Sequence, residues 1–227
     1  MKLYYSPGAC SLADHIVLEW VGASYETVRL SRASLKAPEY LAINEGGTVP
    51  LLVDGDFFLT ENAAILTYVA DLYPKAQLIG DGTPRGRAEV MRWLGFLNSE
   101  LHPAFKLIYL PVQFQPDEAV AVAIIEASRI RVREFLARLD ARLEGRDWLT
   151  GERSIADPYL YVMLRWAIRL EIGLYGFANL VRFAERMYQD SGVRAAITAE
   201  EDGLSQSRSQ FFPAAENTSV PDYRKVS

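Results

Sequence analysis

The sequence predicts two kinds of fold in one chain: an α/β domain at the N-terminus and an all-α domain after it. Two strand patterns separated by a helix open the chain, and two further strands joined by a tight turn follow. Beyond residue 84 the apolar residues recur at helical spacing, without a further strand pattern. With 227 residues, of which 50% are hydrophobic, the chain can bury a core in each domain.

The first strand is expected at Lys2–Tyr5, and a helix at residues 11–22 follows a Pro-Gly turn. Ser11 and Asp14 have the spacing of a capping box, in which the hydroxyl accepts a backbone N–H and the carboxylate reaches back. Tyr25–Leu30 is rich in strand-forming residues and completes a β-α-β unit.

The second unit is expected to be β-β-α. Gly46–Pro50 leads into a strand at Leu51–Val53, and a turn at Asp54–Asp56 leads into a strand at Phe57–Leu59. Glu61–Leu72 is an apolar helix that ends before a proline.

We expect residues 1–76 to form the first domain, residues 77–84 a linker, and residues 85–202 the helical domain. Residues 203–227 are polar and lack an apolar period, so we expect a mobile tail. Ser154 and Asp157 form a second capping-box pattern. Helices are expected at residues 85–109 with an interruption near Pro103, and at residues 117–143, 155–172, 177–191 and 194–201.

The composition argues against several classes of partner. The 24 Lys and Arg residues against 29 Asp and Glu give a net charge of -5, so nucleic acid is not expected to bind. No stretch approaches the roughly 18 apolar residues of a membrane span, and no secretory signal pattern opens the chain. A single cysteine allows no internal disulfide, and no metal-site spacing is present. We therefore expect a cytoplasmic protein with no metal and no membrane partner.

Cys10 lies where a turn gives way to a helix. The unpaired N–H groups and the dipole of a helix N-terminus favour the thiolate, which is the reactive form of cysteine. A lone cysteine is also often a small buried hydrophobe. Position alone therefore leaves a reactive and a structural role open.

Two further places suit a peptide-like ligand. Val49-Pro50 opens a strand, where proline is unusual. A cis bond there would expose the Val49 N–H and C=O to a ligand backbone, whereas a trans bond is the commoner state. At Glu61 and Asn62 a strand gives way to a helix, and this combination suits a ligand with both an ammonium and a carboxylate group. It also fits a plain helix N-cap.

Five segments carry a resemblance to a known family: Met1–Leu12 (MKLYYSPGACSL), Gly47–Leu51 (GTVPL), Leu59–Glu61 (LTE), Ser99–His102 (SELH) and Ser154–Asp157 (SIAD). In this order and near this spacing, they resemble bacterial beta-class glutathione S-transferases. The resemblance covers about residues 1–200. It implies a thioredoxin-like N-terminal domain followed by a helical-bundle C-terminal domain.

The resemblance also implies a glutathione site. Val49 would pair with the cysteinyl backbone of glutathione across a cis Pro50, and Glu61 and Asn62 would hold the γ-glutamyl end. Lys36 is the candidate for the glycine carboxylate.

Four side chains would surround the glutathione sulfur according to the same resemblance: Tyr5, Cys10, Ser11 and His102. Members of this family can form a mixed disulfide between this cysteine and glutathione. The candidates for the hydrophobic substrate pocket are Phe105, Tyr109 and Trp166. Relatives form homodimers, in which Glu100 would reach toward the neighbouring subunit's ligand.

The leading prediction is a glutathione S-transferase that joins the glutathione thiolate to a small hydrophobic electrophile, with glutathione as co-substrate. Such a site lowers the thiol pKa and holds the sulfur near the electrophile. One alternative is thiol-disulfide exchange through Cys10, which a second glutathione would have to resolve because the chain has no other cysteine. The other is a noncatalytic module that binds apolar ligands or partner proteins.

Overall fold

One mixed sheet of four strands organises the N-terminal part of the structure, a computed structural model that describes residues 1–110 and 117–201. The strands are β1 (Lys2–Tyr5), β2 (Glu26–Arg29), β3 (Leu51–Asp54) and β4 (Phe57–Thr60). Their spatial order is β2-β1-β3-β4. β1 is parallel to β2 and antiparallel to β3, and β3 and β4 form the predicted hairpin.

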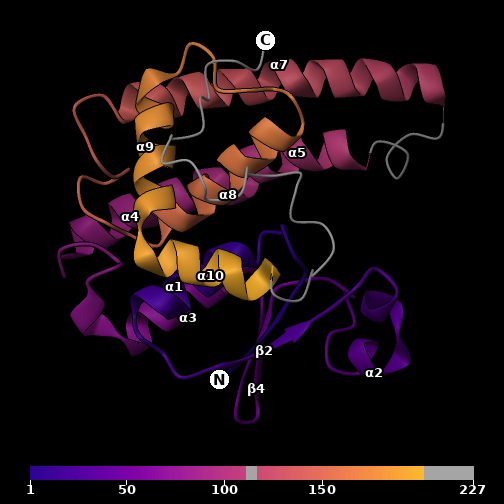
Figure 1. Cartoon of the computed structure of the whole chain (residues 1–227), viewed down its shortest axis with the longest axis vertical. Coiled ribbons are helices and arrows are strands. Elements are labelled where there is room, and N and C mark those ends of the chain that lie inside the picture. Colours follow the sequence, from indigo (N-terminus) through magenta and orange to yellow (C-terminus); the bar gives the residue numbers. More distant parts are fainter. Residues whose placement is uncertain (111–116, 202–227) are drawn as a thin grey trace, which may run out of the picture.

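Helices surround this sheet and build the rest of the chain (Figure 1). The helices are α1 (Leu12–Trp20), α2 (Pro38–Leu41), α3 (Asn62–Leu72), α4 (Pro84–Phe96), α5 (His102–Tyr109), α7 (Glu118–Arg142), α8 (Ala156–Arg169), α9 (Ala178–Gln189) and α10 (Ser191–Glu201). The predicted combination of an α/β fold with an all-α fold is confirmed. The tail predicted at residues 203–227 lies outside the described residues.

The two faces of the sheet pack against different helices because side chains alternate along each strand. Leu3 and Leu52 belong to the main core, which they share with α1 and α3. Tyr4 faces the other side, where its ring lies 5.7 Å from that of Tyr40 in α2. The short helix α2 was not predicted, since four residues are too few to show a period.

Helix α1 is the element on which the two parts of the chain meet. It packs against α3 and also against α8 and α10 of the helical part, and Figure 1 shows α10 beside α1. Its residues 12–18 are all buried, and two of them, Asp14 and His15, are polar. A helix that is buried on all sides is normally apolar all round. The burial of two polar residues therefore suggests that they serve the nearby site around Cys10.

The interruption predicted near Pro103 lies just upstream of that residue. α4 and α5 are joined by a π-helical turn at Leu97–Leu101, and Pro103 is the second residue of α5. A proline ring clashes with the carbonyl four residues before it, here that of Ser99, and widening the turn removes this clash. The helix therefore changes pitch instead of breaking.

The capping box predicted at Ser11 and Asp14 is wrong. Ser11 has helical backbone angles, and its hydroxyl donates to the Ser6 carbonyl at 3.4 Å. The N–H groups of Leu12 and Ala13 already donate to the carbonyls of the preceding turn. These backbone groups therefore need no side-chain cap.

The second capping box forms around Asp157. Its carboxylate accepts bonds from the Ser154 N–H at 2.7 Å, the Ser154 hydroxyl at 3.0 Å and the Leu149 N–H at 3.0 Å. The side chain is fully buried, and this burial raises the pKa of Asp157 to about 6. The carboxylate thus ties the segment before α8 to the first turn of that helix.

We predict that Asp157→Ala lowers the free energy of unfolding by about 3 kcal/mol, because it leaves buried N–H groups of two residues without an acceptor. Ser154→Ala should cost about 1 kcal/mol, because the hydroxyl's bond to Asp157 and a long 3.4 Å bond from the Ala156 N–H are lost while the backbone bonds to Asp157 remain. Urea denaturation of both variants measures the difference. A loss below about 0.5 kcal/mol for Asp157→Ala would contradict this role.

Candidate active site

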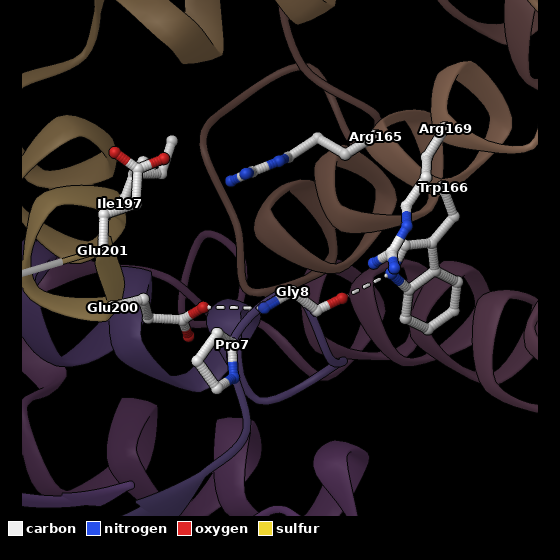
Figure 2. Close-up of a pocket in the computed structure, with 8 residues that line it drawn as sticks. All are labelled: Pro7, Gly8, Arg165, Trp166, Arg169, Ile197, Glu200 and Glu201. Carbon is white, nitrogen blue, oxygen red and sulfur yellow. Dashed lines mark hydrogen bonds between the residues drawn. The ribbon is translucent and has the colours of Figure 1, made fainter. Parts of the chain in front are cut away.

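Two helices of the helical part hold the loop that leads to Cys10. Figure 2 shows Gly8 between them: its N–H donates to Glu200 Oε2 at 3.1 Å, and its carbonyl accepts from Trp166 Nε1 at 2.9 Å. Gly8 has a φ of +73°, which glycine adopts without strain. The same residues border a cavity of about 100 Å³ that Arg165 and Arg169 also line. The backbone of this loop is therefore fixed from both sides.

Glu200 also fixes the chain beyond Cys10. Its Oε1 lies 3.4 Å from His15 Nδ1, and the Glu200 side chain is 4% exposed. One carboxylate thus bonds to positions 8 and 15, which bracket Cys10. His15 therefore has a structural role in this contact.

The Cys10 thiol is held in its neutral form. It is partly buried and donates toward the Val49 carbonyl, with Sγ and O 3.6 Å apart. Burial and then the negative charge of Asp14 raise the pKa of the Cys10 thiol to about 12. The Asn62 amide and two backbone N–H groups act in the opposite direction but are outweighed. In this structure the thiol form of Cys10 is therefore favoured over the thiolate that a helix N-terminus alone would favour.

Two buried side chains beside this cysteine have no hydrogen-bond partner within the described residues. Both carboxyl oxygens of Asp14 and both amide atoms of Asn62 are affected, and the two residues are 1% and 4% exposed. Burial and the neighbouring Glu200 raise the pKa of Asp14 well above its usual value. The backbone N–H of Asp14 acts in the opposite direction but is outweighed, so Asp14 gives up its proton less readily than an exposed aspartate does.

The Val49-Pro50 peptide bond is cis, as the resemblance implies. The backbone before it is crowded: a Cβ at Gly47 would lie 2.7 Å from the Leu35 carbonyl oxygen and 3.3 Å from Lys36 Nζ. Gly47 also has a φ of +55°, so only glycine fits. The Lys36 ammonium therefore lies beside the segment that leads to Val49.

Glu61 has the backbone geometry of a functional position. Its φ is +72°, which is uncommon for a residue other than glycine and is typically found where a ligand is held. The side chain is exposed and makes no capping bond to α3, which excludes the plain N-cap alternative. Asn62, in contrast, points inward toward Cys10, so the two neighbouring side chains face different surroundings.

His102 lies in a hydrogen-bonded chain with Tyr159 and Asn98. The Tyr159 hydroxyl donates to Asn98 Oδ1 at 3.0 Å and lies 2.7 Å from His102 Nδ1. Since a tyrosine hydroxyl has one hydrogen, His102 donates Nδ1–H and keeps Nε2 as an acceptor. Burial and then the charge of Lys106 lower the pKa of His102 to about 4, so the imidazole is neutral at physiological pH.

The three residues predicted for the substrate pocket gather around one indole. Phe105 and Tyr109 lie edge-on to Trp166, with ring centroids 5.6 and 5.9 Å away, and His102 lies 4.9 Å away. Phe105 is fully buried, whereas Tyr109 is 36% exposed. Tyr109 and Trp166 are therefore better placed than Phe105 to meet a ligand.

The other candidates for the site, Tyr5, Ser11 and Glu100, make contacts elsewhere in the structure or face solvent. The Tyr5 hydroxyl donates to the Ala199 carbonyl at 3.5 Å, so this side chain points toward α10. Ser11 is buried and bonds to Ser6. Glu100 is exposed on the π-helical turn.

Three important residues were not predicted for the site. Asp14 gives a signal, because it is a carboxylic acid within an otherwise apolar helical stretch. Neither Tyr159 nor Glu200 belongs to a local site motif, and Glu200 is about 190 positions from Cys10 in the sequence. Among residues 1–110 and 117–201, no group of three metal-binding side chains is found, and no helix is long and apolar enough to cross a membrane.

Residues 1–71 match the family model described as glutathione S-transferase, N-terminal domain, and residues 101–190 match the one described as glutathione S-transferase, C-terminal domain. The glutathione S-transferase GST-4.5 of Xanthomonas campestris is 46% identical over 201 residues, which cover 88% of this chain and 98% of that protein. The glutathione S-transferase GstA of Escherichia coli O157:H7 is 35% identical over 205 residues, with the same coverage of 88% and 98%.

Solved structures give the same result. A glutathione S-transferase from Xylella fastidiosa superposes with a TM-score of 0.84 at 45% identity, covering 88% of this chain and 98% of that one. A sphingomonad glutathione S-transferase complexed with glutathione gives 0.79 at 39% identity, covering 90% and 100%. The beta-class enzyme of Sphingomonas chungbukensis gives 0.77 at 38% identity, covering 88% and 98%. The predicted resemblance is thus confirmed, and the chain belongs to the glutathione S-transferase family.

Proposed function

We propose that this protein conjugates glutathione, through its thiolate, to small hydrophobic electrophiles. The observation that carries the proposal is Glu61, an exposed carboxylate with left-handed backbone geometry at the start of α3. Burial is the main cause that raises the pKa of Tyr159, and the negative charge of Glu61 adds to it, so Glu61 lies within electrostatic reach of the hydrogen-bonded pair of Tyr159 and His102.

The proposed site binds glutathione at its γ-glutamyl end, its cysteinyl unit and its glycine end. Glu61 takes the γ-glutamyl ammonium, and the first N–H groups of α3, that of Asn62 included, take the adjacent carboxylate. The backbone of Val49 pairs with the cysteinyl unit, and Lys36 takes the glycine carboxylate. Each assignment matches the charge of the ligand group.

The sulfur chemistry follows from neutral groups around Cys10. A neutral Cys10 thiol can donate a hydrogen bond to the glutathione thiolate, and His102 offers a neutral Nε2 as an acceptor for the thiol proton. The glutathione sulfur then attacks the electrophilic carbon, a carbon–sulfur bond forms and the leaving group departs. Tyr109 and Trp166 provide the apolar wall for the electrophile. The raised pKa of Cys10 weighs against thiol-disulfide exchange as the main activity.

We predict that Glu61→Ala weakens glutathione binding about tenfold, because a charge-assisted contact with the ammonium is lost without opening a core cavity. Isothermal titration calorimetry measures this change. Glu144→Ala, which removes an exposed glutamate after α7, is the matched control and should bind like the wild type. Equal affinity of both variants would contradict the site, and failure of the wild type to bind immobilised glutathione would contradict the function.

Cys10→Ala separates the two sulfur chemistries. We predict that the variant loses thiol-disulfide exchange with hydroxyethyl disulfide, because the only protein sulfur is gone. It should keep at least about a tenth of the wild-type kcat/KM with a chloronitroaromatic substrate, because glutathione is the nucleophile there. A loss of conjugation beyond about a thousandfold would assign Cys10 a covalent role.

The proposal includes a homodimer. Phe57 and Phe58 on β4 are 46% and 49% exposed, and Leu72 at the end of α3 is 46% exposed. Met91 on α4, also exposed, lies 3.8 Å from the Thr67 hydroxyl of α3, and the Phe57 ring lies 5.5 Å from that of Tyr68 on the same helix, so Phe57 and Met91 both adjoin α3. Exposed apolar surface of this kind is typical of an interface. A cytoplasmic location also belongs to the proposal, supported by the single free cysteine.

Light scattering at micromolar concentration should give twice the 25.5 kDa mass of one chain. Phe57→Glu should shift the protein toward the monomer, because a charge would be buried in the interface without a partner. A wild-type mass of 25.5 kDa would contradict the dimer.

A further inference from the structure

Asp14 lies one helical turn beyond Cys10. Tight turns lead directly into α1, because the N–H groups of Leu12 and Ala13 donate to the carbonyls three residues earlier and Ser11 already has helical backbone angles. Side chains four residues apart on a helix have Cβ atoms roughly 5–6 Å apart. The Asp14 carboxyl and the Cys10 sulfur therefore face the same region, and Asp14 is 1% exposed there.

The groups that face Cys10 or Asp14 from the neighbouring helices supply no positive charge. They are the Asn62 amide on α3, the Tyr159 phenol on α8 and the Glu200 carboxylate on α10. On α1 itself, the Nδ1 of His15 faces Glu200. Within the part of the chain that the structure describes, neither carboxyl oxygen of Asp14 has a hydrogen-bond partner.

A pair of acids in such surroundings does not lose both protons easily. Two negative charges close together in a buried place repel strongly, and the Asn62 amide and the nearby backbone N–H groups offset this repulsion only in part. The carboxyl is the stronger acid of the two groups, so the first proton lost comes from Asp14. The thiolate of Cys10 would then have to form next to an existing negative charge.

We propose that Asp14 is a specificity-determining residue that keeps Cys10 in the thiol form, so that glutathione and not Cys10 supplies the nucleophilic sulfur. This assignment rests on the proposed conjugating function. The raised pKa values of Cys10 and Asp14 agree with it. An uncharged residue at position 14 should therefore favour thiol-disulfide exchange.

Thiol-disulfide exchange at Cys10 proceeds in two steps. The Cys10 thiolate attacks one sulfur of oxidised glutathione, the Cys10–glutathione disulfide forms, and the sulfur–sulfur bond of the reagent breaks. One glutathione leaves as a thiolate with the electron pair. A second glutathione thiolate then attacks the mixed disulfide, which regenerates Cys10 and oxidised glutathione.

The test compares Asp14→Asn and Asp14→Ser with the wild type in alkylation by iodoacetamide between about pH 6 and pH 9. Because the chain has one cysteine, a gain in intact mass reports Cys10 alone. At the alkaline end of this range, where Asp14 is most fully ionised, we expect Asp14→Asn to react at least about fivefold faster, since each unit of lowered pKa raises the thiolate fraction about tenfold. The mixed disulfide with oxidised glutathione should form faster by a similar factor, and the ratio of exchange to conjugation should rise.

Glu19→Gln is the matched control, because it removes a carboxylate from the same helix nine residues, or about 13 Å, beyond Cys10. It should react within about twofold of the wild type. A loosened fold would speed alkylation at every pH without moving its pH dependence, and that result would overturn the assignment. Alkylation of both Asp14 variants at the wild-type rate would overturn it as well. If Asp14→Asn does not fold, the alkylation of Asp14→Ser is the test. Wild-type conjugation, measured separately, tests the proposed function.

Discussion

The backbone of Gly8 is the point on which the arrangement of the site depends. Its N–H is bonded by Glu200 from the last described helix, and its carbonyl is bonded by Trp166 from α8. Because the second oxygen of Glu200 contacts His15, the chain is held both before and after Cys10. The position of the sulfur is therefore set by the helical part of the molecule, although Cys10 belongs to the α/β part.

Burial of α1 between the two parts also determines the charge of the sulfur. A helix N-terminus normally favours a thiolate, and its N–H groups act in that direction here. The loss of water contact and the nearby Asp14 act against the thiolate and prevail. A neutral thiol suits a group that donates a hydrogen bond to a substrate thiolate. His102 is also neutral, so its free ring nitrogen suits a hydrogen-bond acceptor.

The fold was predictable because its signals are local. Alternating strands, the turn at Asp54–Asp56 and the helical periods depend on a few neighbouring residues, and the cis Val49-Pro50 bond follows from the resemblance to relatives. The electrostatic state of the site was not predictable, because it depends on how deeply α1 is covered and on Glu200, which is remote in sequence. Ser11 and Asp14 match a capping box in residue type and spacing, but the carbonyls of the preceding turn already accept hydrogen bonds from the first N–H groups of the helix. Equal spacing at Ser154 and Asp157 does produce the cap, because the segment before α8 leaves N–H groups for the carboxylate.

A crystal structure of the protein with reduced glutathione at neutral pH tests the central claim most directly. The account predicts the ammonium of the ligand at Glu61, its cysteinyl backbone paired with Val49, and its sulfur near Cys10 but not bonded to it. The two sulfurs should be more than about 3 Å apart, compared with about 2.05 Å in a disulfide. Glutathione bound away from Glu61 and Val49, or joined to Cys10 through a disulfide under reducing conditions, would contradict the account.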